Sequence, residues 1–191
     1  MALEHEARAP MRRVESAIAG RTGRIVLRDD TCAWADGSTG HYAVVDGPQS
    51  TLIVPVFEDG DTVLVRQWRY PWGGTSWEVP AGTMEPDEEP AACARRELEE
   101  EAGLRAGTLT PLGRLRPWGT GTIVQHLFLA RDLGPTERRL ELYERDMIVR
   151  RLPLADALAA AMAGEIEHAG SNVALVRAAR LESWPRTGES S

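Results

Sequence analysis

This chain has few cysteines and no long apolar run, and both features limit the classes of protein to which it can belong. Its 191 residues include only Cys32 and Cys93, too few for a disulfide framework or a zinc-ligand pattern. A reducing cytoplasm is therefore the expected compartment. The N-terminus has no apolar stretch of signal-peptide or transmembrane length, so we expect neither export nor membrane insertion.

Positive charge is also scarce. The chain has 22 Lys and Arg residues against 29 Asp and Glu residues, a net charge of -7. This balance argues against partners such as nucleic acid or an anionic membrane surface. It also disfavours an anionic substrate, unless cations or local arginines mediate the contact. Hydrophobic residues make up 42% of the chain, enough for one globular domain of good size, with or without an appendage.

The order of secondary-structure signals predicts an α/β domain with a mixed sheet. A short helix is expected over 11–19, and turn signals follow at Asp36-Gly37 and Asp46-Gly47. We divide the chain into a polar N-terminal segment, a small N-terminal β-subdomain, the main domain and a disordered tail, at residues 1–19, 20–50, 51–184 and 185–191.

Five strands and three helices are expected in the main domain. The first two strands are joined by a hairpin turn at Asp59-Gly60. The others are "SWEVPAG", "VQHLFLARDL" and "MIVRRLPL". Cap and stop signals place the three helices from Asp87 to Gly103, from Pro153 to Gly164 and from Ser171-Asn172 onward.

The run "RRELEEEAGL", residues 95–104, concentrates four glutamates on one predicted helix. Like charges at helical neighbours repel each other, so the run requires an explanation. At about 100° per residue, Glu97, Glu100 and Glu101 converge beside the apolar stripe, whereas Glu99 points away. Convergent carboxylates suit a hard divalent cation. A solvated acidic helix face is the competing interpretation.

A longer pattern surrounds this run. Gly82 is followed after five residues by Glu88, and after seven more by Arg96-Glu97-Leu98. One free residue then precedes Glu100-Glu101, and another precedes Gly103-Leu104. The whole pattern resembles the box of the Nudix family without a mismatch.

The resemblance to the Nudix family implies a fold, a reaction and a set of site residues. The fold is an α/β/α sandwich around a mixed β-sheet, and the reaction is hydrolysis of a nucleoside diphosphate linked to another group. The cofactor is Mg²⁺ or Mn²⁺, which neutralises charge on the pyrophosphate and so removes the objection from net charge. The implied metal ligands are Glu97, Glu100, Glu101 and the backbone carbonyl of Ala81. The supporting residues are Glu88 and Arg96, with Gly82 and Gly103 as structural glycines of the box.

The flank "LVRQWRYPWGGTSWEVPAGTME" resembles the ADP-ribose and nucleoside-diphosphosugar pyrophosphatases of that family. The resemblance implies that Arg66 and Arg69 reach the phosphates or the terminal ribose, and that Glu78 contacts the substrate or a phosphate-bound network. It also implies a homodimer to which the 20–50 subdomain contributes. The expected products are a nucleoside monophosphate and a sugar phosphate.

One position departs from that subfamily. Its members carry a glutamate, a metal ligand or the base, in the loop that aligns with "RPWGTGTIVQ", but Ile123 stands there in this chain. Replacement from a later loop by Glu141, Glu144 or Asp146 stays open. Two alternatives for function stay open as well: another nucleoside-diphosphate derivative as substrate, or a nucleotide-binding module without useful turnover.

Overall fold

The computed structural model describes residues 9–183, which form two compact units. Trp118–Ile123 joins the residues up to Pro48 in the first unit, and the rest of the chain forms the second. The predicted tail at 185–191 lies outside the described residues. Within the described part, no helix is long and apolar enough to cross a membrane.

The first unit is a three-stranded antiparallel sheet in the order β1-β2-β3. Its strands are β1 (Met11–Thr22), β2 (Ile25–Trp34) and β3 (Thr39–Asp46). The helix expected over 11–19 is wrong, because β1 pairs with β2 along most of its length and meets its backbone hydrogen-bonding needs there. The turn at Asp36-Gly37 is confirmed between β2 and β3, where Trp34 N–H bonds the Ser38 carbonyl at 2.9 Å.

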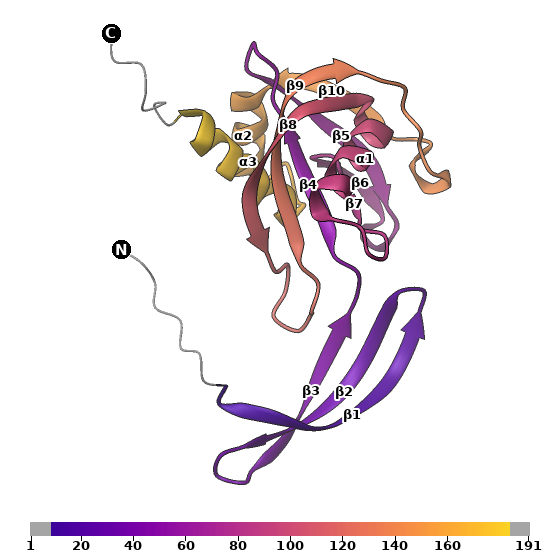
Figure 1. The fold of residues 1–191 in the computed structure, drawn as a ribbon, viewed down its shortest axis with the longest axis vertical. Helices are drawn as coiled ribbons and strands as arrows, with labels where there is room; N and C mark the ends of the chain where they lie inside the picture. Colours follow the sequence, from indigo (N-terminus) through magenta and orange to yellow (C-terminus); the bar gives the residue numbers. More distant parts are fainter. Residues whose placement is uncertain (1–8, 184–191) are drawn as a thin grey trace. The chain divides into compact units, whose positions relative to one another are not determined.

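The second unit contains the predicted mixed sheet and a second, smaller sheet (Figure 1). In the mixed sheet, ordered β7-β4-β9-β8, β4 and β9 run parallel and the other pairs are antiparallel. Its strands are β4 (Ser50–Pro55), β7 (Ala81–Thr83), β8 (Leu104–Leu115) and β9 (Gln125–Pro135). The smaller antiparallel sheet, ordered β10-β5-β6, consists of β5 (Asp61–Arg69), β6 (Gly74–Glu78) and β10 (Ile148–Pro153).

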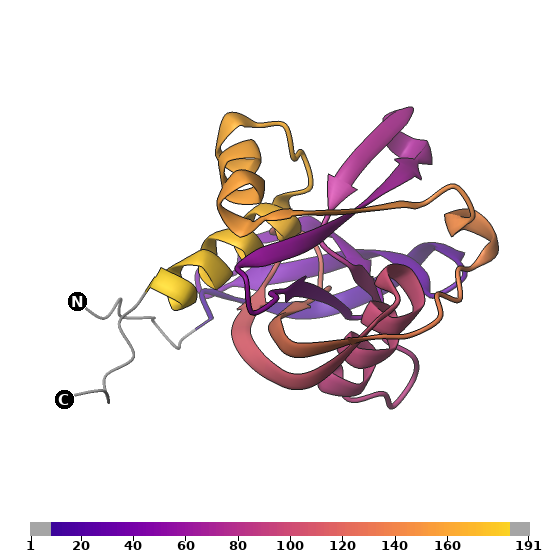
Figure 2. The same cartoon turned by 90° about the horizontal axis from the view of Figure 1, so that it is seen from above.

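Helices cover both faces of the mixed sheet, which confirms the α/β/α sandwich. On one face Leu98 packs with Ile53 and Phe128. On the other face Leu52 and Leu127 form a core with side chains of α2 and α3. Figure 1 shows α1 on the opposite side of the strands from α2 and α3, which lie side by side in Figure 2. The helices are α1 (Pro90–Ala102), α2 (Leu154–Ala163) and α3 (Ala169–Ser183), and two short 3₁₀ turns are η1 (Tyr70–Trp72) and η2 (Leu142–Glu144).

Two strand predictions need correction. The turn at Asp59-Gly60 forms, but β4 and β5 do not make a hairpin: after one bridge between Val56 and Thr62 they enter different sheets. "SWEVPAG" is likewise two strands, since β6 ends before Val79 and β7 starts after Pro80. Proline has no N–H to donate, and the chain changes sheets at this point.

The C-terminal ends of α1 and α2 lie where the sequence predicts them, whereas the N-terminal ends of α1 and α3 do not. Gly103 ends α1 with a left-handed φ of 66°, and its N–H bonds the carbonyls of the preceding turn. Gly164 ends α2 in the same way. Asp87 is not the cap of α1, which begins at Pro90 after Glu89. Helix α3 begins at Ala169, before the predicted Ser171.

Candidate active site

Arg96 ties the loop before α1 to the helix. Its Nε and Nη2 donate to the two carboxylate oxygens of Glu88, each at 3.0 Å, and Nη2 also donates to the Thr83 carbonyl at 3.1 Å. The guanidinium holds the pKa of Glu88 at about 2, below its ordinary value. A charge-assisted bidentate pair fixes both partners in direction as well as in distance. The loop and the first turns of α1 are therefore joined through one side chain.

The same guanidinium contacts two of the three carboxylates that are predicted to bind the metal. Nη1 of Arg96 donates to Glu97 Oε1 at 2.7 Å and to Glu100 Oε2 at 3.1 Å. Glu99 lies apart, as its helical position predicts, and pairs with Nε of Arg105 at 3.3 Å. The exposed fraction of the Glu99 side chain is 24%, close to the 25% of Glu100. Glu99 is therefore less exposed than an outward-facing residue would be.

Glu101, the third predicted ligand, is buried with 1% of its surface exposed. Its Oε2 accepts the backbone N–H of Ala81 at 2.8 Å, so the Ala81 backbone lies at the carboxylates. Burial raises the pKa of Glu101 well above its ordinary value, and burial raises the pKa of Glu97 to about 7 although Arg96 opposes that shift. Two acidic groups therefore lie beside each other in poorly solvated positions.

Gly82 approaches Glu97 so closely that any side chain at this position would displace the carboxylate of Glu97. A Cβ on Gly82 would lie 1.9 Å from the carboxyl carbon of Glu97 and about as near to both its oxygens. Such contacts are far inside van der Waals distance. The glycine of the box thus allows the loop backbone to lie against a carboxylate.

These residues suit a divalent cation by their chemistry. Within residues 9–183, no three Asp, Glu, His or Cys side chains are gathered in an arrangement that could hold a metal. The contacts explain this, because Arg96 engages Glu97 and Glu100 while Glu101 turns to the Ala81 N–H. The oxygens nevertheless form a hard donor set, and a cation would remove the cost of burying their charge.

Of the three predicted substrate-binding residues, Arg69 and Glu78 lie together, whereas Arg66 lies apart. Arg69 Nε and Nη2 donate to Glu78 Oε1 and Oε2 at 2.7 and 2.5 Å, and the charge of Glu101 acts on Arg69. Arg66 lies on the opposite face of β5, with its guanidinium 5.7 Å from the ring centroid of Trp77. Residues three apart on a strand face opposite sides, so Arg66 and Arg69 cannot point to one ligand from the same surface.

Sequence reasoning did not single out His168, and it left Glu144 among three alternatives. Nδ1 of His168 lies 3.2 Å from Glu78 Oε2, although the two residues are far apart in the chain and share no motif. Glu144, in η2, is the acid of the three whose charge raises the pKa values of Glu97 and Glu101. Ile123 belongs to the first unit, where its side chain lies against Gly47.

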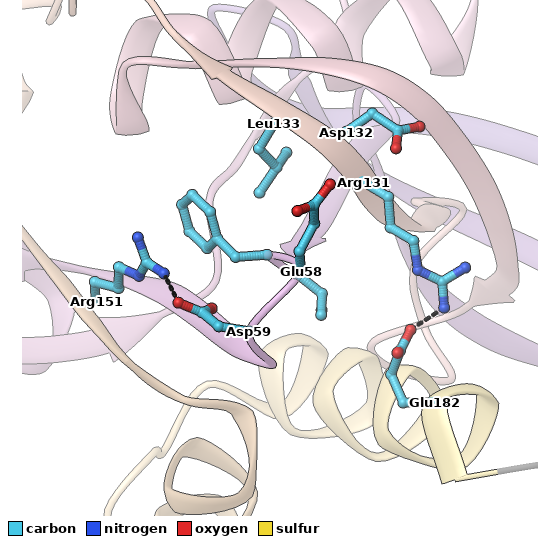
Figure 3. Close-up of a pocket in the computed structure, with 9 residues that line it drawn as sticks. Glu58, Asp59, Arg131, Asp132, Leu133, Arg151 and Glu182 are labelled. Atoms are coloured by element: carbon cyan, nitrogen blue, oxygen red, sulfur yellow. Dashed lines mark hydrogen bonds and ion pairs between the residues drawn. The ribbon is translucent and has the colours of Figure 1, made fainter.

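A separate cavity of about 840 Å³ lies at the other end of β4 (Figure 3). Arg131 and Arg151 line it, and Figure 3 shows them directed at Glu182 and Asp59. Because carboxylates engage both arginines, the cavity presents neither of them free to a phosphate group. The carboxylate cluster on α1 is therefore the candidate active site.

Comparison with known proteins places this geometry in a family. The model of the NUDIX domain matches residues 47–170. An ADP-ribose pyrophosphatase of Bacillus subtilis (strain 168) is 35% identical over 125 residues, 64% of this chain and 68% of that protein. An ADP-ribose pyrophosphatase of Mycobacterium tuberculosis is 32% identical over 151 residues, 76% of this chain and 72% of that protein.

A solved structure shares the fold. The crystal structure of an ADP compounds hydrolase superposes with a TM-score of 0.80, covering 93% of this chain and 96% of that chain at 21% identity. The matched domain includes the whole box from Gly82 to Leu104. The chain therefore belongs to the Nudix family, as a hydrolase related to the ADP-ribose pyrophosphatases.

Proposed function

We propose that this chain is a divalent-metal-dependent pyrophosphatase of ADP-ribose or a related nucleoside-diphosphosugar, with a nucleoside monophosphate and a sugar phosphate as products. The observation that carries the proposal is that Arg96 joins Glu97 and Glu100, while the Gly82 loop lies against Glu97 and the Ala81 N–H bonds Glu101. The names of the two bacterial relatives support the choice of substrate class. A cytoplasmic location stays a prediction of the sequence.

The metal would be Mg²⁺ or Mn²⁺, held by the carboxylates of Glu97, Glu100 and Glu101 and by the Ala81 carbonyl. Bound there, it would supply charge neutralisation at the pyrophosphate and a lowered pKa for an attacking water. Arg96 restrains Glu97 and Glu100 by donating to one oxygen of each. The second oxygen of each carboxylate takes no part in these two contacts.

Arg69 is the side chain best placed to bind the diphosphate. Its Nε and one N–H of Nη2 are used by Glu78, which leaves Nη1 for a phosphate oxygen. Its side chain is 34% exposed, whereas that of Glu78 is fully buried. Glu78 therefore orients Arg69 in this proposal and makes no direct contact with the substrate. Arg66, on the other face of β5, takes no part in the same contact.

Glu144 is our choice for the acid that Ile123 cannot supply. Its charge acts on Glu97, Glu101 and Arg69, which are the groups that surround the proposed reaction. A carboxylate at that position can accept the proton of an attacking water. Its Oε2 also accepts the Glu141 N–H at 3.0 Å, which steadies the η2 turn that carries it.

A substrate panel tests the proposed function. With Mg²⁺ or Mn²⁺, we expect kcat/KM for ADP-ribose, UDP-glucose or GDP-mannose to exceed that for dGTP, because Arg69 can bind a diphosphate that links two groups. Removal of the metal with EDTA should abolish turnover, and added Mg²⁺ should restore it. If dGTP is the best substrate, the substrate class is wrong. If no compound is hydrolysed with either metal, a nucleotide-binding role replaces the proposal.

The metal set is tested by one matched pair of variants on α1. Glu101→Gln removes a buried charge from the cluster, so we expect kcat for the best substrate to fall by roughly 10²-fold or more. Glu99→Gln changes a residue that pairs with Arg105 outside the cluster and should leave kcat within about threefold. Isothermal titration with Mn²⁺ should show weaker binding for the first variant alone. Equal losses in both variants would contradict the assignment.

The proposed role of Glu144 as the base is tested by comparing a variant of Glu144 with the same change at Glu141, its partner in the reciprocal cap. Glu144→Gln keeps an oxygen for the Glu141 N–H but cannot take a proton, so we expect kcat to fall by roughly 10²- to 10⁴-fold. Glu141→Gln makes the same chemical change on the other side of the reciprocal cap and should have little effect. Steady-state rates over a range of Mg²⁺ concentrations separate a lost base from a lost metal ligand. Full activity in Glu144→Gln excludes the role.

We also propose a homodimer to which the first unit contributes. Its three strands have no helix of their own within the described residues, and they expose several large apolar side chains: Val14, Ile18, Ile25, Leu27, Trp34 and Tyr42. Light scattering at micromolar concentration should therefore give twice the 21.0 kDa chain mass. Ile18→Glu should shift the protein toward monomer, and Thr22→Glu should not. A monomeric unmutated protein rules the dimer out.

A further inference from the structure

We infer that His168 is a positioning residue that fixes the direction of Arg69 through the carboxylate of Glu78. The inference rests on the proposed function in one respect, the role of Arg69 in binding substrate. The contact chain itself does not depend on any substrate. It joins the residue before α3 to the β5–β6 hairpin, two segments that are distant in the sequence.

Glu78 requires more than one donor because it is fully buried. A buried carboxylate without enough hydrogen-bond donors is costly, since it has lost its water. Arg69 supplies two N–H groups, at 2.7 and 2.5 Å. Nδ1 of His168 lies 3.2 Å from Oε2, the same oxygen that accepts from Arg69 Nη2. The carboxylate thus has the Arg69 guanidinium and the His168 ring as neighbours.

The neighbours of His168 bear on which of its two ring nitrogens carries the proton. Nδ1 faces both Glu78 Oε2 and Ser171 Oγ, which lies at 2.8 Å and itself accepts the Val79 N–H at 3.0 Å. Burial lowers the pKa of His168, so the neutral ring carries a single N–H. With that proton on Nε2, two lone pairs would face each other across 3.2 Å. We place the proton on Nδ1, since the Ser171 hydroxyl can either accept or donate at 2.8 Å, whereas Glu78 Oε2 can only accept.

The ring of His168 also contacts the segment that follows Arg69. Its centroid lies 6.4 Å from that of Trp72, with the planes tilted by 45°. Trp72 belongs to the η1 turn, which begins directly after Arg69. His168 thus contacts the carboxylate that holds Arg69 and also the turn that follows it. Loss of the Nδ1 donor should let Glu78 turn, and Arg69 would then spend less time in the orientation that binds a ligand.

Two variants separate the donor from the ring. His168→Asn places an amide N–H near the position of Nδ1, whereas His168→Phe keeps a ring against Trp72 but has no donor. His126→Phe is the control, because His126 bonds Gln49 at 2.6 Å and does not belong to this network. Thermal melting verifies that each variant folds. If His168→Phe does not fold, His168→Leu, which also has no donor, replaces it.

The first experiment needs no substrate. Nitrogen NMR of the unmutated protein should show His168 protonated on Nδ1, and exchange of the Arg69 Nε–H with solvent should be slow. His168→Asn should keep that exchange slow, and His168→Phe should speed it by about tenfold or more. An Nε2-protonated ring, or equal Arg69 exchange in all variants, overturns the inference. This result stands whether or not the chain hydrolyses ADP-ribose.

The second experiment is a double-mutant cycle on ADP-ribose hydrolysis. His168→Phe should raise KM by about tenfold, the effect of one charge-assisted hydrogen bond, and change kcat by less than about threefold. His168→Asn should restore KM. When Arg69 is already replaced by Ala, His168→Phe should raise KM no further. A general structural defect would instead raise KM in both backgrounds. Additive losses overturn the inference. Absence of turnover in the unmutated protein instead contradicts the proposed function, and the NMR result then decides the role of His168.

Discussion

The guanidinium of Arg96 contacts three carboxylates that would otherwise repel each other. Glu88 comes from the loop before α1, whereas Glu97 and Glu100 belong to the helix itself. A planar group with five donors can satisfy several acceptors in fixed directions, which a lysine could not do. The path of the loop, the orientation of the helix and the spacing of the acidic groups all depend on this side chain.

Packing of α1 on the mixed sheet explains why the acidic groups are buried. Leu98 and Ala94 are fully buried against Ile53 and its neighbours, and this fixes the rotation of the helix. Glu97 and Glu101 flank that stripe, so they must face inward whether or not a cation is present. The burial of apolar side chains thus forces charge into a poorly solvated place. Raised pKa values of Glu97 and Glu101 are the direct result.

Local patterns in the sequence were sufficient for helix α1, whereas the layers were predicted from the resemblance of the box to the Nudix family. The spacing of Glu97, Glu100 and Glu101 depends only on helical geometry, and Gly103 ends the helix by a local backbone preference. The opposite faces of Arg66 and Arg69 on β5 also follow from strand alternation.

Other features depend on contacts between distant segments, and no local pattern marks them. The strand at Met11–Thr22 has a weak pattern of its own and is defined by its pairing with β2. The division of "SWEVPAG" between two sheets depends on which neighbours each half finds. His168 meets Glu78 only because the first turn of α3 packs beside the end of β6, where Ser171 bonds the Val79 N–H.

The divergence of β4 and β5 after a single bridge affects how such a protein can change over evolution. The carboxylates lie on the helix that covers the mixed sheet, whereas Arg69 and Glu78 belong to the smaller sheet. Under the proposed role of Arg69, substitutions, insertions or altered turns between β5 and β6 would therefore change substrate selection without disturbing the packing under α1. Under the same proposal, the chemical step and the choice of substrate depend on different sheets, so each could change independently on one scaffold.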